Sequence, residues 1–172
     1  MVYIRVKKFK RKNGKIVKYA YLVKSRWKKR VGKGSKQGAR QKVKGFLGRV
    51  CKGTVVKDVN FFEHFKISDL DSYVKENSLR KIAEDLVGFE FVKHDVNDVY
   101  VNFDEQVVRR DGNKTVVQMN DGFLCDYTLN KLVGFRFKED ESEAGMALAK
   151  VFVDAGIKIP EELFVKVFEK VS

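Results

Sequence analysis

The sequence predicts an α+β protein, in which an N-terminal three-stranded antiparallel basic β-module is followed by a mixed α+β domain ending in two helices. Three observations predict this class. An Asn-Gly dipeptide separates two stretches rich in Val, Ile, Tyr and Phe, which is the strongest short-range signal of a β-hairpin. Apolar residues recur at helical spacing towards the C-terminus. The balance of charge also changes sign near residue 58.

Charge divides the 172-residue chain into two parts. Residues 1–57 hold 21 of the 36 Lys and Arg and no Asp or Glu, so the other 115 residues carry 15 basic against 23 acidic side chains. We expect residues 1–57 to be a basic nucleic-acid-binding module and residues 58–172 to be an acidic α+β domain. A segment this basic repels itself unless a polyanion neutralises it. Nucleic acid is the obvious polyanion, because bound phosphates release condensed counterions.

The first predicted element is a hairpin of residues 1–10 and 15–27 around Asn13-Gly14. A two-residue type I′ turn needs positive φ at both central positions, which suits Asn-Gly. With this turn the paired residue numbers sum to 27, and Val6 faces Tyr21 on the buried face. The opposite face then interleaves cations with aromatic rings. A slip of one residue would exchange the faces of one strand.

A basic loop and a third strand are expected next. Residues 28–40 combine Gly and Ser with many cations, a composition typical of a flexible loop. Residues 41–50 predict a strand that ends at Gly48, with Val43 and Leu47 on one face and Phe46 on the other. A basic strand face is often only a solvated surface, but solubility alone does not require the absence of interspersed acids.

The acidic part predicts helices, short strands and a second hairpin. Ser78 is a suitable helix N-cap, Gly156 suits the left-handed position after a helix, and Pro160 suits a helix start. The expected helices cover residues 67–76, 78–86, 128–135, 142–155 and 160 onwards. The expected strands cover residues 89–93 and 99–103, and a hairpin of 107–110 and 114–119 around Asp111-Gly112-Asn113.

Several function classes are disfavoured by the sequence. No secretory signal and no apolar run of membrane-spanning length is present, so we expect a cytoplasmic protein with no membrane partner. Cys51 and Cys125 have no neighbouring Cys or His at zinc-binding spacing. We expect two buried free thiols rather than one disulfide. No cofactor and no metal is expected.

Catalytic signals are weak. The glycines of the basic loop lack the Gly-Lys-Ser/Thr ending of a phosphate-binding loop, and the two histidines are isolated. Carboxylates that could hold Mg²⁺ for a nuclease are available. They are Asp95 and Asp98 beside His94, and Asp104, Glu105, Asp121 and Asp126. Because scattered acids in a charged protein are usually solvated, we expect a non-catalytic protein and keep a metal-dependent nuclease as an alternative.

The basic module is the one strong functional signal. Lys and Arg bind phosphates, Arg also recognises guanine edges, and aromatic rings stack on exposed bases. The predicted nucleic-acid-binding residues are Arg5, Lys7, Lys8, Lys10, Arg11, Lys12, Lys18, Lys24, Arg26, Trp27, Lys28, Lys29, Arg30, Lys33, Lys36, Arg40, Lys42, Lys44 and Arg49.

Two phrases of sequence flank the basic loop. The matching positions are Tyr19, Tyr21, Leu22, Val23 and Ser25, and then Arg40, Gln41, Lys42, Val43, Leu47 and Gly48. This series resembles the short N-terminal β-module of some insertion-sequence transposases, over less than a third of the chain. The resemblance implies a DNA-binding or DNA-positioning role. A transposase would continue into a catalytic domain with widely spaced acids, for which the rest of this chain leaves little room.

The sequence therefore predicts a non-catalytic nucleic-acid-binding protein, with DNA favoured, that contacts phosphates through the hairpin, the loop and the third strand. The alternative is a ribosome- or rRNA-associated RNA-binding protein, whose basic loop orders against RNA. Residues 58–172 would bind a protein partner or a second copy of the chain. A further alternative is an interaction module whose acidic part covers the basic part until a partner arrives.

Overall fold

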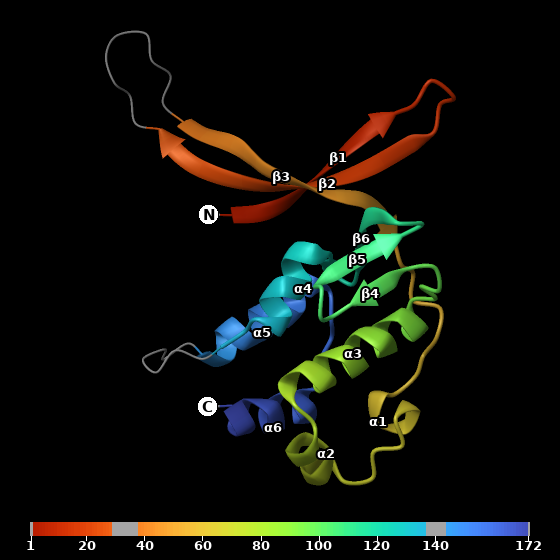
Figure 1. The fold of residues 1–172 in the computed structure, drawn as a ribbon, viewed down its shortest axis with the longest axis vertical. Coiled ribbons are helices and arrows are strands. Elements are labelled where there is room, and N and C mark those ends of the chain that lie inside the picture. Colours follow the sequence, from red (N-terminus) through yellow and green to blue (C-terminus); the bar gives the residue numbers. More distant parts are fainter. Residues whose placement is uncertain (1, 29–37, 137–143, 172) are drawn as a thin grey trace.

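The computed structural model describes residues 2–28, 38–136 and 144–171, and all side chains within these ranges except those of Lys28 and Val171. The fold is mixed α+β, as predicted, with three antiparallel strands at the N-terminus and helices at the C-terminal end. Figure 1 shows the three strands arching across one end of a second part, which contains all the described helices. Residues 1–57 are named the β-module here, and residues 58–172 the body.

The β-module and the body share one seven-stranded sheet. Strands β1, β2 and β3 form an antiparallel meander, and the end of β3 pairs in parallel with β6 of the body. Strand β6 pairs in turn with β5 and β7, and β5 with β4. The strands are β1 (Val2–Lys10), β2 (Ile16–Lys28), β3 (Gly38–Lys52), β4 (Tyr100–Asn102), β5 (Val107–Arg110), β6 (Asn113–Met119) and β7 (Gly122–Leu124). The division of the chain into two domains after residue 57 stays a prediction.

The hairpin of the body is confirmed. Strands β5 and β6 are joined by Asp111 and Gly112, whose φ angles are 49° and 72°. Positive φ at both positions is what a two-residue type I′ turn requires.

The hairpin of the β-module is also present, but its predicted register is wrong by one residue. Paired residue numbers sum to 26, so Arg5 rather than Val6 faces Tyr21. Of the turn residues, Gly14 alone has positive φ, 79°, and the Arg11 N–H donates to the Lys15 carbonyl at 2.8 Å. This is a type I turn followed by a residue in the left-handed region, which makes the hairpin loop three residues long instead of two.

The corrected register exchanges the two faces of β2. The inner face packs against Val116 and Cys125 of the body, so that one side of the meander is covered. It consists of Ile4, Val6, Ala20, Leu22 and Leu47. The other side is named the outer face, and it carries Tyr21, which the predicted register buries.

Strand β3 is longer than predicted and does not end at Gly48. Its pairing with β2 shifts at two positions, so Val43 and Phe46 lie together on the outer face while Leu47 packs with Ala20 on the inner face. The prediction that Val43 and Leu47 lie on the same face of the strand is therefore wrong, because each extra residue at a bulge interrupts the alternation of faces.

Six helices belong to the described part of the body. They are α1 (Phe61–His64), α2 (Leu70–Glu76), α3 (Leu79–Lys93), α4 (Asp126–Val133), α5 (Ala144–Ala155) and α6 (Glu161–Val171). The five predicted helices start within three residues of these positions, although residues 142 and 143 lie outside the described ranges. Helix α1 and strand β7, which are four and three residues long, were not predicted.

The core of the body gathers around α3. Its Ile82, Leu86 and Phe89 pack with apolar side chains of the strands and of the other helices. The predicted strand at 89–93 is wrong, since these residues form the last turns of α3. The aromatic residues there favour a strand locally, but burial of a stripe at helical spacing outweighs that preference.

Gly48 of β3 lies close against the backbone of the body at Lys114. Its φ is 137°, and a Cβ there would lie 2.4 Å from the Lys114 carbonyl oxygen. We expect Gly48→Ala to lower the free energy of unfolding by about 2–4 kcal/mol, because alanine is strained at this φ and its Cβ would overlap backbone atoms, which cannot move aside as a side chain can. Chemical denaturation measures the free energy of unfolding. Gly45→Ala is the matched control, since no atom lies within 4 Å of its added Cβ, and equal stability of the two variants would contradict the close contact.

Candidate nucleic-acid interface

The cations of the β-module have no acidic partners where their side chains are described. Among the described side chains, no Lys or Arg before residue 58 forms an ion pair. The body instead pairs its own charges, for example Arg109 with Asp126 at 2.6 Å and Lys81 with Asp85 at 2.7 Å. The alternative in which the acidic part covers the basic part thus has no ion pair to support it in these ranges.

Like charges face each other across the strands of the meander. Three such pairs are Lys8–Lys18, Lys24–Lys42 and Arg26–Arg40. Side chains directly opposite in an antiparallel sheet have Cβ atoms about 4.5–5.5 Å apart, and like charges there destabilise the sheet. An external anion between the two side chains would remove this repulsion, so each pair is a candidate phosphate contact.

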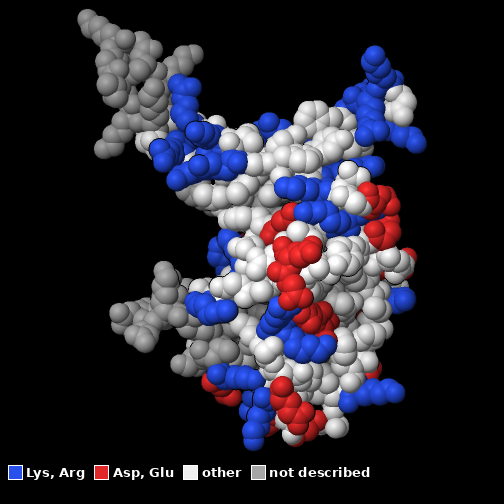
Figure 2. Space-filling view, in the orientation of Figure 1, with Lys and Arg blue, Asp and Glu red and all other residues white. Residues whose placement is uncertain are grey.

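The cations gather at the two ends of the meander. Figure 2 shows Lys and Arg at both ends, whereas the Asp and Glu on this side lie over the body. One end is the β1–β2 turn, and the other is formed by residues 24–28 and 38–44, named the β2–β3 arm. A pocket of about 180 Å³ on the arm is lined by Lys24, Arg26, Arg40, Gln41, Lys42 and Lys44.

Between these ends, the outer face carries a row of aromatic rings. The ring centroid of Tyr19 lies 5.7 Å from that of Phe9 and 5.9 Å from that of Phe46. The Phe46 centroid lies 5.5 Å from that of Tyr21, and the Lys7 ammonium is 5.2 Å from the Tyr21 ring. Phe9 is 44% exposed and Phe46 is 48% exposed. Exposed rings beside cations form a surface on which bases can stack.

Hydrogen bonds position Arg5 on the same face. Its Nη1 donates to Oε1 of Gln41, and Nε2 of Gln41 donates to the Tyr3 hydroxyl at 2.6 Å. A guanidinium has five N–H donors, so one internal hydrogen bond fixes the side chain and leaves others for a phosphate.

The predicted site residues with described side chains fall into three groups. The outer face carries Arg5, Lys7 and Arg49. The turn end carries Lys8, Lys10, Arg11, Lys12 and Lys18, and the arm carries Lys24, Arg26, Arg40, Lys42 and Lys44, with Trp27 65% exposed. The side chain of Lys28 and the whole of Lys29, Arg30, Lys33 and Lys36 lie outside the described part.

The wrong register hid two candidate base-stacking residues. The sequence places Tyr19 and Tyr21 on the buried face, whereas both lie on the outer face. It also places Lys18 and Lys24 on the aromatic face, whereas they lie on the side of β2 that carries Ala20. Asn-Gly suits either turn, so the alternation of residues gave no signal that could separate the two registers.

Several of the acids considered for a nuclease have partners within the body. Asp104 accepts a hydrogen bond from Arg80 at 2.8 Å, and Asp98 pairs with Arg110. His94 is buried against another carboxylate on its own helix. In the ranges described, no group of three or more His, Cys, Asp or Glu side chains is arranged to hold a metal ion.

Both cysteines are free thiols. Cys125 is buried as expected, and burial raises the pKa of its thiol. Cys51 is half-buried rather than buried, and its Sγ accepts a hydrogen bond from Nη1 of Arg110 at 3.1 Å. This hydrogen bond raises the pKa of the Arg110 guanidinium.

Two further findings bear on function. None of the helices in residues 2–28, 38–136 and 144–171 has the length and apolar character needed to cross a membrane. Comparison with protein-family models, with curated proteins and with solved structures gives no match for this chain. Its function is therefore inferred from the geometry and charge of the β-module.

Proposed function

We propose that the chain is a non-catalytic nucleic-acid-binding protein of the cytoplasm, with DNA as the favoured ligand. The observation that carries the proposal is that described cations of the β-module face one another across the strands and have no carboxylate partners. Such pairs destabilise the free protein, and bound phosphates would offset that cost. A merely solvated surface would mix acids with its cations.

The two ends and the outer face have different tasks in this proposal. The turn end and the β2–β3 arm supply Lys and Arg for phosphates, while Arg5 and Arg49 lie beside the aromatic row. A two-stranded β-ribbon fits the major groove of duplex DNA, and the resemblance to a transposase β-module also favours DNA. The body would supply the surface for a protein partner or a second copy of the chain.

RNA binding in a ribosome- or rRNA-associated protein is the second candidate. It is favoured by the exposed rings of Phe9 and Phe46. Unpaired bases that stack on aromatic side chains are the usual targets of sequence-specific RNA recognition.

Fluorescence anisotropy with labelled duplex DNA and a labelled RNA hairpin at matched salt tests the proposal. If about six to ten cations contact phosphates, affinity for duplex DNA falls about 10³- to 10⁵-fold between about 50 and 200 mM salt. The corresponding slope of log affinity against log salt is roughly −5 to −9. Binding to neither polymer at physiological ionic strength contradicts the proposal, and a clear preference for RNA reverses the order of the two candidates.

A nuclease assay checks the non-catalytic part of the proposal. Plasmid incubated with Mg²⁺ or Mn²⁺ is expected to stay intact. Cleavage that disappears on Asp104→Asn substitution would show that the protein is an enzyme on nucleic acid.

A further inference from the structure

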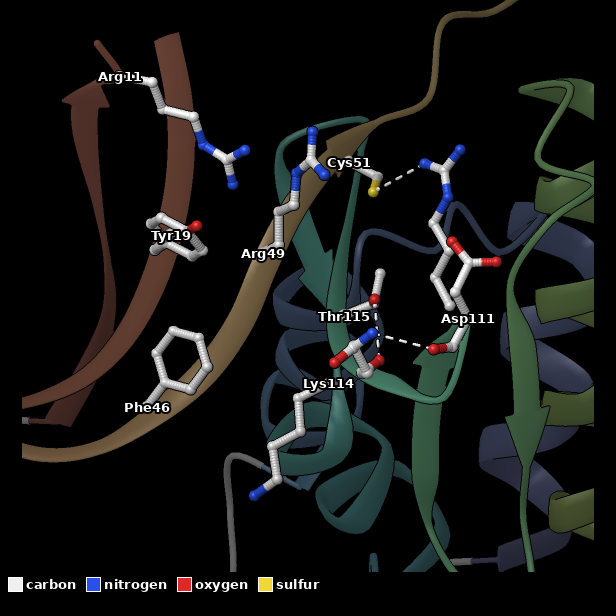
Figure 3. Close-up of a pocket in the computed structure, with 10 residues that line it drawn as sticks. Arg11, Tyr19, Phe46, Arg49, Cys51, Asp111, Lys114 and Thr115 are labelled. Atoms are coloured by element: carbon white, nitrogen blue, oxygen red, sulfur yellow. Dashed lines mark hydrogen bonds between the residues drawn. The ribbon is translucent and has the colours of Figure 1, made fainter. Parts of the chain in front are cut away.

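A pocket of about 590 Å³ lies at the seam between the β-module and the body. Its volume lies within the range of roughly 300–1,000 Å³ that is typical of small-ligand sites. The parallel pairing of β3 with β6 brings its two sides together. Figure 3 shows Arg11, Tyr19 and Phe46 of the meander on one side, and Asp111, Lys114 and Thr115 of the β5–β6 hairpin on the other.

The meander gives this seam pocket an aromatic side. Tyr19 and Phe46 both line it, and their ring centroids are 5.9 Å apart. Almost half of the Phe46 side chain is exposed, so its ring is available for stacking without rearrangement. Every nucleobase has a flat face that can stack on such a ring.

The seam pocket also carries an excess of positive charge. Arg11, Arg49 and Lys114 line it and form no ion pair among the described side chains. Arg110 differs from them, because it pairs with Asp98 and donates to Cys51. A site that joins unpaired guanidinium groups to aromatic rings suits a ligand with both a phosphate and a flat base.

We propose that the seam pocket holds one unpaired nucleotide of the bound strand, with its base against Phe46 and Tyr19 and its phosphate at Arg11 and Arg49. This inference rests on the proposed function and names the state of the ligand. A base inside a duplex is stacked between its neighbours and does not reach such a pocket, so the ligand is a single-stranded segment, an unpaired overhang or a bulge. The body takes part in recognition through Lys114.

Cys51 provides a reporter inside the seam pocket. It lines the pocket and is half-buried, whereas Cys125 is fully buried with a raised thiol pKa, so an alkylating reagent distinguishes the two. The rate of Cys51 alkylation by iodoacetamide is followed by mass spectrometry. The Cys51→Ser variant is the control that measures alkylation at any other residue. The probes are an unstructured single-stranded oligonucleotide, a blunt duplex of equal length and a strand of abasic residues. Each is used at a concentration that anisotropy shows to saturate the protein.

The single-stranded oligonucleotide is expected to slow alkylation of Cys51 about tenfold or more, and the duplex and the abasic strand less than about twofold. Equal protection by all three probes would overturn the pocket proposal and leave nucleic-acid binding intact. Failure of every probe to bind would instead overturn the proposed function. Equal protection by a free nucleoside monophosphate would assign the pocket to a small ligand and also overturn the proposal.

A pair of variants distinguishes the contribution of the seam pocket to binding from that of the rest of the aromatic row. Phe46→Ala is expected to lower the affinity for the single strand about tenfold while changing the affinity for the duplex less than about twofold. Phe9→Ala removes a ring of similar exposure outside the pocket, so the ratio of the two affinities is expected to stay unchanged. Equal changes of that ratio in the two variants would overturn the proposal.

Discussion

Replacing Arg26 and Arg40 together with Ala is expected to lower the affinity for duplex DNA more than tenfold at about 100 mM salt. The two residues are directly opposite each other in the pairing of β2 with β3 and line the small pocket of the β2–β3 arm. Each lost phosphate contact reduces the log–log salt slope by about 0.9, so the slope of the double variant should be smaller in magnitude by about 2. Anisotropy titrations at four or five salt concentrations measure both quantities.

The same double variant is not expected to be less stable. Removing one pair of facing like charges relieves a repulsion of roughly 0.2–1 kcal/mol in the sheet. For a chain of this length the melting temperature should stay unchanged or rise by up to about 4 °C. Weaker binding together with undiminished stability separates a role in recognition from a role in folding.

The matched control is the double variant Lys75→Ala, Lys158→Ala. It makes the same change of net charge with exposed lysines of the body. Its affinity is expected to fall much less than that of the arm variant, because charges distant from the interface are largely screened at this ionic strength. Equal losses in the two double variants would mean that net charge rather than the arm determines binding, and no loss in the arm variant would remove the arm from the interface.

Five of the six helices described in the body could be predicted because their signals are local. Ser78 accepts a hydrogen bond from the Lys81 N–H at 3.2 Å at the start of α3, and Gly156 has a φ of 76° after α5. Each signal depends on residues within one turn of the helix end, so the sequence alone contains it.

The register of the first hairpin could not be predicted from local sequence. Asn13-Gly14 suits both the two-residue turn and the three-residue turn that is present. What differs between them is which residues of β2 face the body, and there Ala20 packs with Val116 and Cys125. Those partners lie far along the chain, so only the tertiary contact settles the register.

The location of the candidate site could be predicted from the charge of the sequence, whereas the arrangement of its residues could not. The absence of acids before residue 58 is a property of composition and points to the β-module without a structure. The facing Arg26–Arg40 pair and the seam pocket between Arg49 and Lys114 depend on strand pairing instead. The parallel pairing of β3 with β6 joins segments remote in sequence, and no local pattern predicts such a contact.

Glu90 is expected to be the most sensitive polar residue for stability. Its side chain is fully buried in α3 and accepts two hydrogen bonds. Oε1 accepts from the Lys158 N–H at 2.9 Å, and Oε2 accepts from Nδ2 of Asn120 at 3.1 Å. Nδ1 of His94 lies 3.1 Å from Oε2 and 2.9 Å from the Glu90 carbonyl oxygen, and because both are acceptors Nδ1 carries a proton.

Glu90→Leu would remove the acceptor of the Lys158 N–H, and it would leave Nδ2 of Asn120 and Nδ1 of His94 with one acceptor each, the backbone carbonyl oxygens of Gly156 and of residue 90. We expect it to lower the free energy of unfolding by about 3–5 kcal/mol, since removing one member of a buried network costs far more than its net contribution. The melting temperature should fall by about 6–20 °C for a protein of this size. Thermal and urea unfolding, followed by circular dichroism, measure the two quantities.

Two further variants test the cause of this loss. Glu76→Leu, at an exposed position at the end of α2, is expected to change stability by less than about 0.5 kcal/mol. Glu90→Gln keeps one oxygen, which can accept from the Lys158 N–H while the N–H₂ group faces the donors of His94 and Asn120. In the rotated amide the N–H₂ group faces Lys158 instead. The stability of Glu90→Gln should therefore lie between the stabilities of the two Leu variants. If Glu90→Leu proved as stable as Glu76→Leu, the hydrogen bonds that Glu90 accepts from Lys158 and Asn120 would not hold α3 to the loops around it.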